Sequence, residues 1–170
     1  TKPLFESFIE TAEKLELLTY IKRLYLLENA SEFTTSVEER IRTNKATVFD
    51  SFTAGNPYPI TYLEEWAWNQ LILKAFFMDR PLYTIHDVDK GKNENLANIL
   101  QDFVRERWAA GRTVSPEIWR MIEGYLRDDL IELILERNFK GNEKRAIDMV
   151  TNKSEGPKSD NFWDGIGKVN

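Results

Sequence analysis

Apolar residues recur along the chain at steps of three and four positions, which is the spacing of amphipathic α-helices. Helices joined by short turns predict an all-α fold, with antiparallel helix pairs packed as an irregular α-solenoid or an orthogonal bundle. The predicted helices cover residues 2–20, 17–29, 37–53, 61–78, 94–110, a short stretch after Ser115, 126–139 and 143–151.

Two details of this pattern stay open. The apolar series over residues 17–29 either continues the first helix with a bend or forms the second arm of a hairpin, and we favour two helices. The helix over residues 37–53 has a candidate break near Thr43 and Asn44.

The helix over residues 61–78 is predicted to organise the fold because it is apolar on nearly every side. Thr61 with Glu64 three residues later has the spacing of a capping box. One arc of this helix is predicted to face the core, and Gln70 and Lys74 fall inside that arc. The apolar members of the arc are Leu63, Trp66, Ala67, Phe77 and Met78.

The helix over residues 94–110 has clear ends and one charged residue in an unexpected place. Asn93 is a candidate N-cap, and Gly111 is placed to accept the left-handed conformation after the last turn. Arg107 lies in the middle of the apolar stripe, whereas Arg105, Trp108 and Arg112 project from a neighbouring face.

The domain organisation follows from where these patterns stop. Residues 1–151 are predicted to form a single helical domain. Residues 152–170 are rich in Gly, Ser, Asn and Lys and are predicted to be a polar C-terminal tail, with its first part mobile. Phe162, Trp163 and Ile166 are the residues that can dock this tail on a groove.

Composition excludes several classes of function. A net charge of −5 and a pI near 5.1 argue against binding to nucleic acid or to an anionic membrane surface. Without cysteine the chain has no disulfide, thiol nucleophile or Cys-ligated metal. The chain also has no apolar run long enough for a membrane span and opens without a signal-peptide pattern, so we expect a soluble protein.

Motifs for catalysis are absent from the sequence. It has no glycine-rich phosphate loop, no GxSxG elbow, no HExxH pair and no EF-hand loop. His86, Asp87 and Asp89 are of metal-ligand type, but such residues also occur together on polar surface loops, and we interpret residues 81–93 as a connecting loop. We predict no metal and no cofactor.

Two cations present an electrostatic problem, because Lys74 and Arg107 both lie on stripes predicted to face the core. A buried cation needs a carboxylate, a group of carbonyls or a bound anion. One interpretation is a buried ion pair, with Lys74 alternatively extending its amine to solvent. The other is a pocket for an anionic small molecule walled by Trp or Tyr rings. The candidate carboxylates for the ion pair are Glu64, Glu65, Glu106 and Glu123.

Three runs of residues carry a resemblance to a known family. They are residues 56–59, residues 65–75, and residues 106–112 followed by 115–120. These runs resemble the EboA family, whose members are described as metabolite traffic proteins. The resemblance covers roughly residues 56–120, and the run Glu-Arg-Trp-Ala-Ala-Gly-Arg over residues 106–112 is its most specific part. The chain departs from the family pattern near Gly91 and Glu94, so we assign no role to residues 89–93 from it.

The resemblance implies a mostly helical protein encoded beside a prenyltransferase-like membrane protein and several sugar-metabolism-like enzymes. It places the protein in a gene cluster linked to moving secondary-metabolite precursors to the periplasm. It implies no known reaction for this component.

We therefore expect a non-enzymatic binding or scaffold component of a bacterial pathway that traffics or exports secondary-metabolite precursors. Its expected location is the cytoplasm, including the cytoplasmic face of the inner membrane. The expected partners are proteins of the same pathway, among them the membrane prenyltransferase-like protein, and an anionic or aromatic small molecule, but no nucleic acid. The alternative is a small all-α enzyme that acts on an anionic metabolite near Lys74 and Arg107, with Asp or Glu as general base.

The candidate binding residues combine the two cations, the neighbouring face of the second helix and the residues of the resemblance. They are Asn69, Lys74, Arg105, Arg107, Trp108, Arg112, Trp119 and Arg120.

Overall fold

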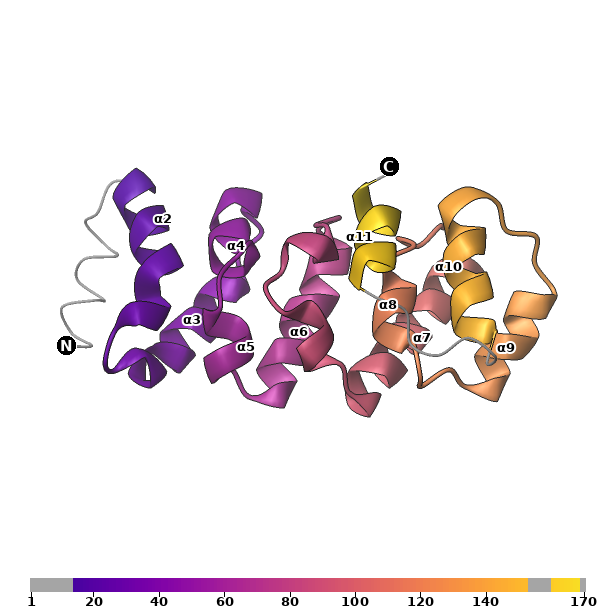
Figure 1. The fold of residues 1–170 in the computed structure, drawn as a ribbon, viewed down its shortest axis with the longest axis horizontal. Helices are drawn as coiled ribbons and strands as arrows, with labels where there is room; N and C mark the ends of the chain where they lie inside the picture. The colour runs from indigo at the N-terminus through magenta and orange to yellow at the C-terminus, as the bar shows by residue number, and fades with distance from the viewer. Residues whose placement is uncertain (1–13, 153–159, 169–170) are drawn as a thin grey trace. The chain divides into compact units, whose positions relative to one another are not determined.

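The computed structural model describes residues 14–152 and 160–168, and the regular structure of these residues is entirely helical (Figure 1). One isolated antiparallel bridge, between Ala54 and Ile85, is the only strand-like pairing recorded in this part of the chain. The predicted all-α class is therefore confirmed. The α-helices are α2 (Lys14–Arg23), α3 (Thr34–Ile41), α4 (Ala46–Thr53), α5 (Tyr58–Tyr62), α6 (Glu65–Phe77), α7 (Glu94–Ala109), α8 (Ile118–Ile122), α9 (Asp128–Leu135), α10 (Gly141–Thr151) and α11 (Asp160–Lys168). The short 3-10 helices are η1 (Leu24–Leu26), η2 (Ala30–Phe33), η3 (Leu82–Thr84) and η4 (Val88–Gly91).

The chain divides into two compact units. Unit 1 is the chain up to Lys74 together with Thr84–Asp87, and unit 2 is Ala75–Tyr83 together with the chain from Val88 onward. Helix α6 begins in unit 1 and its last residues belong to unit 2. The single domain expected over residues 1–151 stays a prediction.

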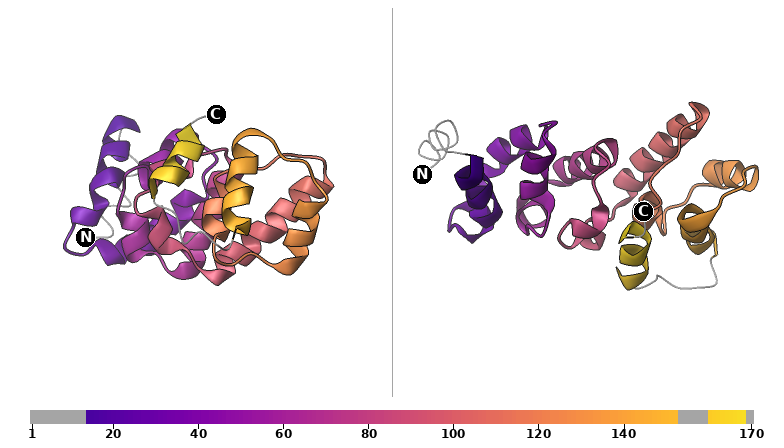
Figure 2. Two further views of the ribbon diagram at one scale, coloured as in Figure 1. Left: turned by 45° about the vertical axis from the view of Figure 1, so that its right-hand side comes forward. Right: turned by 90° about the horizontal axis from the view of Figure 1, so that it is seen from above.

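Unit 1 is built from short helices that pack against α4. Helices α2, α3 and α5 all contact α4 (Figure 2). The aromatic rings of Phe49 and Phe52 on α4 are fully buried. The hydroxyl of Tyr58 donates a 2.7 Å hydrogen bond to the carbonyl of Ala30, which satisfies the one polar atom of another fully buried ring.

The N-terminal pattern is partly confirmed. Helix α2 runs through Tyr20 without a break, so the hairpin that we favoured at this point is wrong, and the chain continues as η1. The candidate break near Thr43 is confirmed, because α3 ends at Ile41 and α4 begins at Ala46. The predicted helix over residues 2–20 lies outside the described residues in its first part, residues 2–13.

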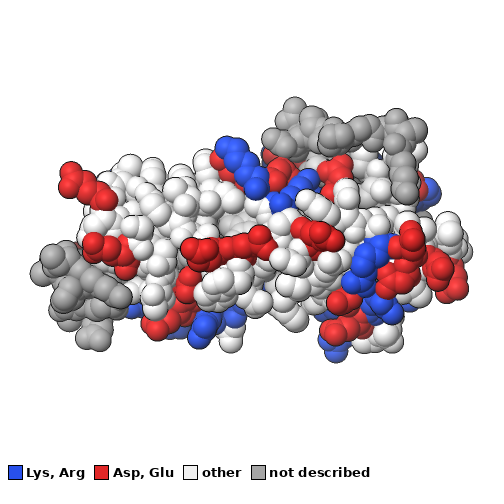
Figure 3. All heavy atoms as spheres, turned by 90° about the horizontal axis from the view of Figure 1, so that it is seen from below, with Lys and Arg blue, Asp and Glu red and all other residues white. Residues whose placement is uncertain are grey.

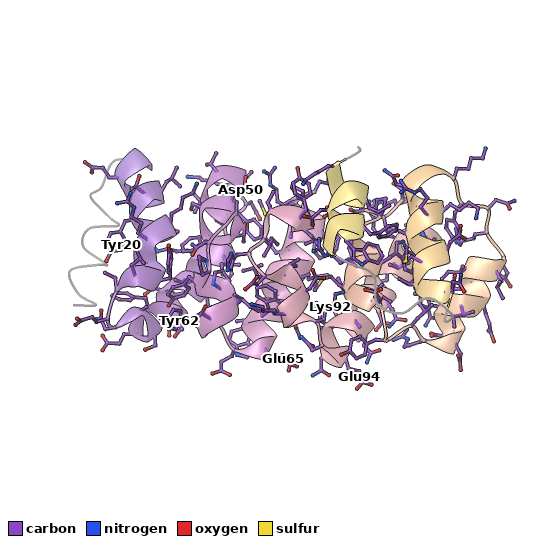
Figure 4. The ribbon with its side chains drawn as sticks, viewed as in Figure 1. Tyr20, Asp50, Tyr62, Glu65, Lys92 and Glu94 are labelled. Carbon is purple, nitrogen blue, oxygen red and sulfur yellow. The ribbon has the colours of Figure 1, made fainter. Side chains whose placement is uncertain are left out.

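The predicted helix over residues 61–78 is two helices. Pro57 and Pro59 favour an earlier start, at Tyr58, and the hydroxyl of Thr61 donates to the carbonyl of Pro57 inside α5 at 2.8 Å. Leu63 then adopts an extended conformation with ψ of 140°, which separates α5 from α6. Tyr62 and Glu65 mark the two sides of this break in Figure 4. The predicted capping box at Thr61 is therefore wrong.

The buried face of α6 also differs from the predicted arc. Trp66 is 54% exposed and Phe77 is 64% exposed, whereas Trp68 is only 4% exposed. The apolar residues that are buried follow one another at alternating steps of one and three, as a helical stripe requires. This stripe is Ala67, Trp68, Leu71, Ile72, Ala75 and Phe76.

Unit 2 is built around α8, which contacts both α7 and α10 (Figure 2). Asn93 caps α7 as predicted, since its side-chain oxygen accepts a 2.8 Å hydrogen bond from the amide of Leu96. Gly111 has a φ of 69°, the left-handed conformation expected after the last turn. Every residue of α8 from Ile118 to Ile122 is buried.

The stretch predicted as a polar tail contains helix α11. Trp163 and Ile166 of this helix are each 1% exposed, so the apolar side chains of the tail do find a covered surface. The expected mobile segment falls mostly in residues 153–159, which lie outside the described residues.

The two tryptophans of α6 provide a test of which face is buried. Trp68→Ala should lower the free energy of unfolding by about 3–5 kcal/mol, because it removes a large buried ring, whereas Trp66→Ala should cost less than about 1 kcal/mol. Urea denaturation of both variants measures the two losses. Equal losses would contradict the observed face.

Candidate functional site

Arg120 is the centre of a polar cluster inside unit 2. It lies on α8 and its side chain is only 4% exposed. Its Nε atom donates to Oδ1 of Asp89 at 2.9 Å and its Nη2 atom donates to Oδ2 of the same residue. Its Nη1 atom donates to Oδ1 of Asp164 at 2.9 Å. The guanidinium group is therefore bound by two carboxylates that are far apart in sequence.

Lys92 and Glu123 extend this cluster. The amine of Lys92 lies 3.1 Å from both Oδ1 of Asp89 and Oε2 of Glu123 (Lys92 is labelled in Figure 4). Burial alone would raise the pKa of Asp89, but the hydrogen bonds and positive charges of Arg120 and Lys92 lower this pKa to about 2. Asp89 is therefore ionised at neutral pH and paired with both cations.

Glu117 is a second buried charge, one helical turn before Arg120. It is 2% exposed, and its two carboxyl oxygens accept hydrogen bonds from the backbone amides of Leu82 (3.1 Å) and Tyr83 (2.9 Å). Burial raises the pKa of Glu117 even though these amides and Arg120 act in the opposite direction.

Glu117 also lines a cleft of about 290 Å³. Arg107 is on the wall of this cleft, where its Nε and Nη2 atoms donate to the carbonyl of Thr113 at 3.1 and 2.9 Å. The remaining lining residues are Phe76, Asp79, Arg80, Pro81, Val114, Ser115 and Pro116.

Helix α11 packs on the Arg120 cluster through contacts with Glu123 and Arg120. Its Trp163 donates the indole N–H to Oε2 of Glu123 at 3.2 Å, and its Asp164 accepts from Arg120. One turn later Gly167 is buried, and the amine of Lys168 lies 5.5 Å from the centre of the Tyr83 ring. These contacts bring together residues 83–123 and residues 163–168.

A larger, open groove of about 620 Å³ lies along α7 and α9. Trp108 forms its aromatic wall and is 6% exposed. The centre of its ring lies 5.9 Å from that of Trp119 and 5.4 Å from that of Phe139. The guanidinium of Arg137 lies over the Trp108 ring, 4.8 Å from its centre. The other lining residues are Asp102, Arg105, Glu106, Ala109 and Leu133.

Two of the four charged residues that line the groove, Asp102 and Arg105, form ion pairs. Arg105 forms an ion pair with Asp129, and Arg127 reaches both Asp102 (2.8 Å) and Asp129 (3.1 Å). Hydrogen bonds from Arg127 lower the pKa of Asp129. At the right-hand end of Figure 3 basic and acidic side chains are accordingly intermingled.

The predicted cations do not lie in a core. Lys74 is half-buried, and its amine donates to the carbonyl of Arg42 at 3.1 Å and to the side-chain oxygen of Asn44 at 2.7 Å. Arg107 is also half-buried and is held by Thr113. Within the described residues neither cation has an ion pair, so the predicted buried salt bridge is wrong and carbonyl or amide oxygens satisfy both charges.

The remaining predicted binding residues fall into separate places. Asn69 is 4% exposed on α6 in unit 1. Arg105 and Trp108 line the groove, and Arg112 is exposed and lines neither cavity. Trp119 is fully buried, and its indole nitrogen has no hydrogen-bond partner among the described residues. Whether each of them binds a ligand stays a prediction.

Sequence reasoning missed the residues that surround Arg120. The sequence pattern predicts a plain connecting loop over residues 81–93, but Asp89 and Lys92 from this segment belong to the cluster. It predicts a polar tail at Asp164, which also belongs to the cluster. One signal for Asp164 is present in the sequence. Trp163 and Ile166 flank Asp164 within a polar stretch, and this amphipathic pattern indicates a segment that packs on the rest of the protein.

The described ranges contain no group of three or more His, Cys, Asp or Glu side chains that could hold a metal ion. None of the helices in residues 14–152 and 160–168 has the combination of length and apolarity that crossing a bilayer requires.

Comparison with known proteins gives one match. The family model described as metabolite traffic protein EboA matches residues 2–123, which is more than half of the chain. No curated protein and no solved structure matches the chain.

The cluster predicts a specific loss of stability in acid. Because the pKa of Asp89 is lower in the folded protein, about 2 against 3.8, the unfolded chain takes up a proton first as the pH falls, and the stability contributed by Asp89 is lost between about pH 4 and pH 2. Asp89→Asn should cost about 2–3 kcal/mol at pH 7, since it leaves buried Arg120 short of a carboxylate. The difference between parent and variant should then shrink across that acid window.

Denaturant unfolding at several pH values measures this difference. Asp148→Asn is the matched control, because Asp148 pairs with Lys144 on an exposed surface and should cost less than about 0.5 kcal/mol at every pH. A difference between parent and Asp89→Asn that stays constant from pH 6 to pH 2 would argue against the assignment.

Proposed function

Because the chain belongs to the EboA family, we propose that it is a non-enzymatic binding component of a pathway that traffics secondary-metabolite precursors. Its ligand is an anionic, aromatic small molecule, which binds in the groove along α7 and α9. The observation that carries this proposal is the Arg137 guanidinium stacked 4.8 Å from the centre of the Trp108 ring on the groove wall.

The groove has the size and chemistry for such a ligand. Its volume of about 620 Å³ lies within the range of small-molecule sites, roughly 300–1,000 Å³. Trp108 and Leu133 supply apolar wall, and a guanidinium can bind a carboxylate through two parallel hydrogen bonds. Arg137 is exposed, and the interactions recorded for its side chain are the ring of Trp108 and the charge of Glu143. Its donors are therefore available to a ligand.

Binding without catalysis fits the two aspartates at the groove that are paired with arginine. Asp102 and Asp129 are engaged by Arg127, and Asp129 is also engaged by Arg105. An Asp whose pKa is lowered by hydrogen bonds from an arginine is a weak general base. These carboxylates support the shape of the groove rather than proton transfer in it.

One observation favours the enzymatic alternative. Glu117 is a buried carboxyl with a raised pKa on the wall of the smaller cleft, beside Arg107, and such groups are typical of general acids and bases. Both of its oxygens, however, already accept backbone amides, which favours a structural role. We therefore keep the enzyme acting on an anionic metabolite as the second candidate.

The pathway context supplies the remaining parts of the proposal. The protein acts on the cytoplasmic side, including the cytoplasmic face of the inner membrane. Its partners are proteins of the same pathway, among them a prenyltransferase-like membrane protein.

Titration with a simple aromatic acid tests the binding proposal. The quenching of tryptophan fluorescence by 4-hydroxybenzoate should be saturable, and Arg137→Gln should weaken this binding at least tenfold because the variant loses the cation that faces the carboxylate. The neutral 4-hydroxybenzamide should bind the parent protein at least tenfold more weakly than the acid.

Arg112→Gln is the matched control for this titration. Arg112 is exposed on the loop after α7 and lines neither cavity, so its variant should bind the acid within twofold of the parent. Equal affinity for the acid and the amide, or an Arg137→Gln variant that binds like the parent, would refute the groove as the site.

A further inference from the structure

We propose that the surface under α11 is a docking site for a helix of a partner protein, and that α11 is a built-in competitor that occupies this site. We call the surface the α11 seat and define it by Tyr83, Lys92, Glu117, Arg120 and Glu123. The inference rests on the proposed function in one respect only, namely that this chain works through binding partners.

The seat binds α11 through a polar pattern as well as through apolar burial. Glu123 accepts the indole N–H of Trp163 at 3.2 Å, and Arg120 donates to the carboxylate of Asp164 at 2.9 Å. Lys92 holds the acceptor Glu123 in place, since its amine lies 3.1 Å from the Glu123 carboxylate. Asp89 holds the donor Arg120 in place, since it accepts hydrogen bonds from two of its nitrogens. The seat is therefore preorganised to recognise an aromatic residue followed by an acid.

The backbone of the docked helix also approaches the seat closely. A Cβ atom at Gly167 would lie 2.6 Å from the carboxyl carbon of Glu117 and 2.7 Å from Cδ1 of Tyr83. Glu117 cannot easily move away, because its two oxygens hold the amides of Leu82 and Tyr83. The seat therefore accepts only glycine at this position of a helix, four residues after the aromatic residue.

The seat and its cover differ in their relation to the family. All five residues of the seat lie within residues 2–123, which match the family model, whereas α11 lies outside them. The part of the chain that the family model describes thus carries a buried arginine whose third nitrogen donates to a carboxylate from beyond it. A carboxylate-bearing helix of another protein offers the same contact.

The sequence of α11 is poorly suited to a permanent helix. It has nine residues, and helices this short are marginal without tertiary contacts. Gly165 weakens it further, since glycine is a poor helix former and this one is exposed with no atom within 4 Å of the position of a Cβ. Close packing explains Gly167 but not Gly165. A weak helix bound by specific contacts is a cover that a stronger helix can displace.

The partner that this chemistry fits is a protein helix with an aromatic residue, an acid next to it, and a glycine four residues after the aromatic. The aromatic ring must donate a hydrogen bond to Glu123, as Trp163 does, and the acid must reach Arg120, as Asp164 does. Because α11 belongs to the same chain, its binding to the seat is intramolecular, and it competes with a partner at a high effective concentration. A partner helix must therefore bind better than α11 does.

A matched pair of glycine variants in the full chain tests the competition. Gly167→Leu places a side chain against Glu117 and Tyr83 and should release α11, whereas Gly165→Leu points into open space and should leave it docked. The probe is a fluorescently labelled peptide with the sequence of residues 160–168, and its binding is followed by fluorescence anisotropy. Gly167→Leu should bind the peptide at least tenfold more tightly than the parent or Gly165→Leu.

The recognition contact is tested in the same assay. A peptide that carries Asp164→Asn should bind the Gly167→Leu protein at least tenfold more weakly than the unaltered peptide, because it loses the charge that faces Arg120. Equal affinity of the two glycine variants for the unaltered peptide, equal affinity of the two peptides, or no binding by any of the proteins would each overturn the proposal.

A measurement on the parent protein tests the proposal even if the Gly167→Leu variant does not fold. A saturating concentration of the peptide should raise the hydrogen-exchange rate of the amides of α11 at least tenfold, and an unchanged rate would overturn the proposal. Neither experiment uses an aromatic acid or Arg137. Failure of the groove titration therefore leaves this result unaffected, and failure here leaves the groove unaffected.

Discussion

A buried guanidinium group sets the conditions that the rest of unit 2 must satisfy. Arg120 is nearly inaccessible to solvent, and a charge in that position is tolerated only when its donors are paired. Asp89 comes from the segment before α7 and Asp164 comes from α11, so satisfying one side chain ties three distant parts of the sequence together. The helices that surround α8 are held in the arrangement that delivers these two carboxylates.

The residue that precedes the same short helix is a buried acid, and the two groups are bound by partners of different kinds. Arg120 is bound by carboxylates, whereas Glu117 is bound by the backbone amides of Leu82 and Tyr83. The carboxylates around Arg120 keep it ionised, but amides carry only partial charge, so burial dominates at Glu117 and raises its pKa. A five-residue helix cannot be stable alone, and these two networks together with burial of its apolar residues hold it in place.

Local signals in the sequence were sufficient where structure depends on neighbouring residues. The cap at Asn93 and the left-handed Gly111 define the ends of α7 because both act within one helical turn. For α6 the sequence was ambiguous: Trp66 and Trp68 are equally apolar, and only the surrounding chain determines which of them is buried. The partners of Arg120 were beyond local reasoning, since they lie 31 and 44 residues away among 28 acidic residues.

Helix α8 also lies between the two surfaces that we propose as binding sites, the groove and the α11 seat. Trp119 and Arg120 are adjacent, so their side chains leave the helix about 100° apart. Trp119 packs against Trp108 on the wall of the groove, with ring centres 5.9 Å apart, and Arg120 faces Asp164 of α11. One short helix therefore supplies a residue behind the groove wall and a residue of the α11 seat, so the fold of α8 is a requirement that both surfaces share.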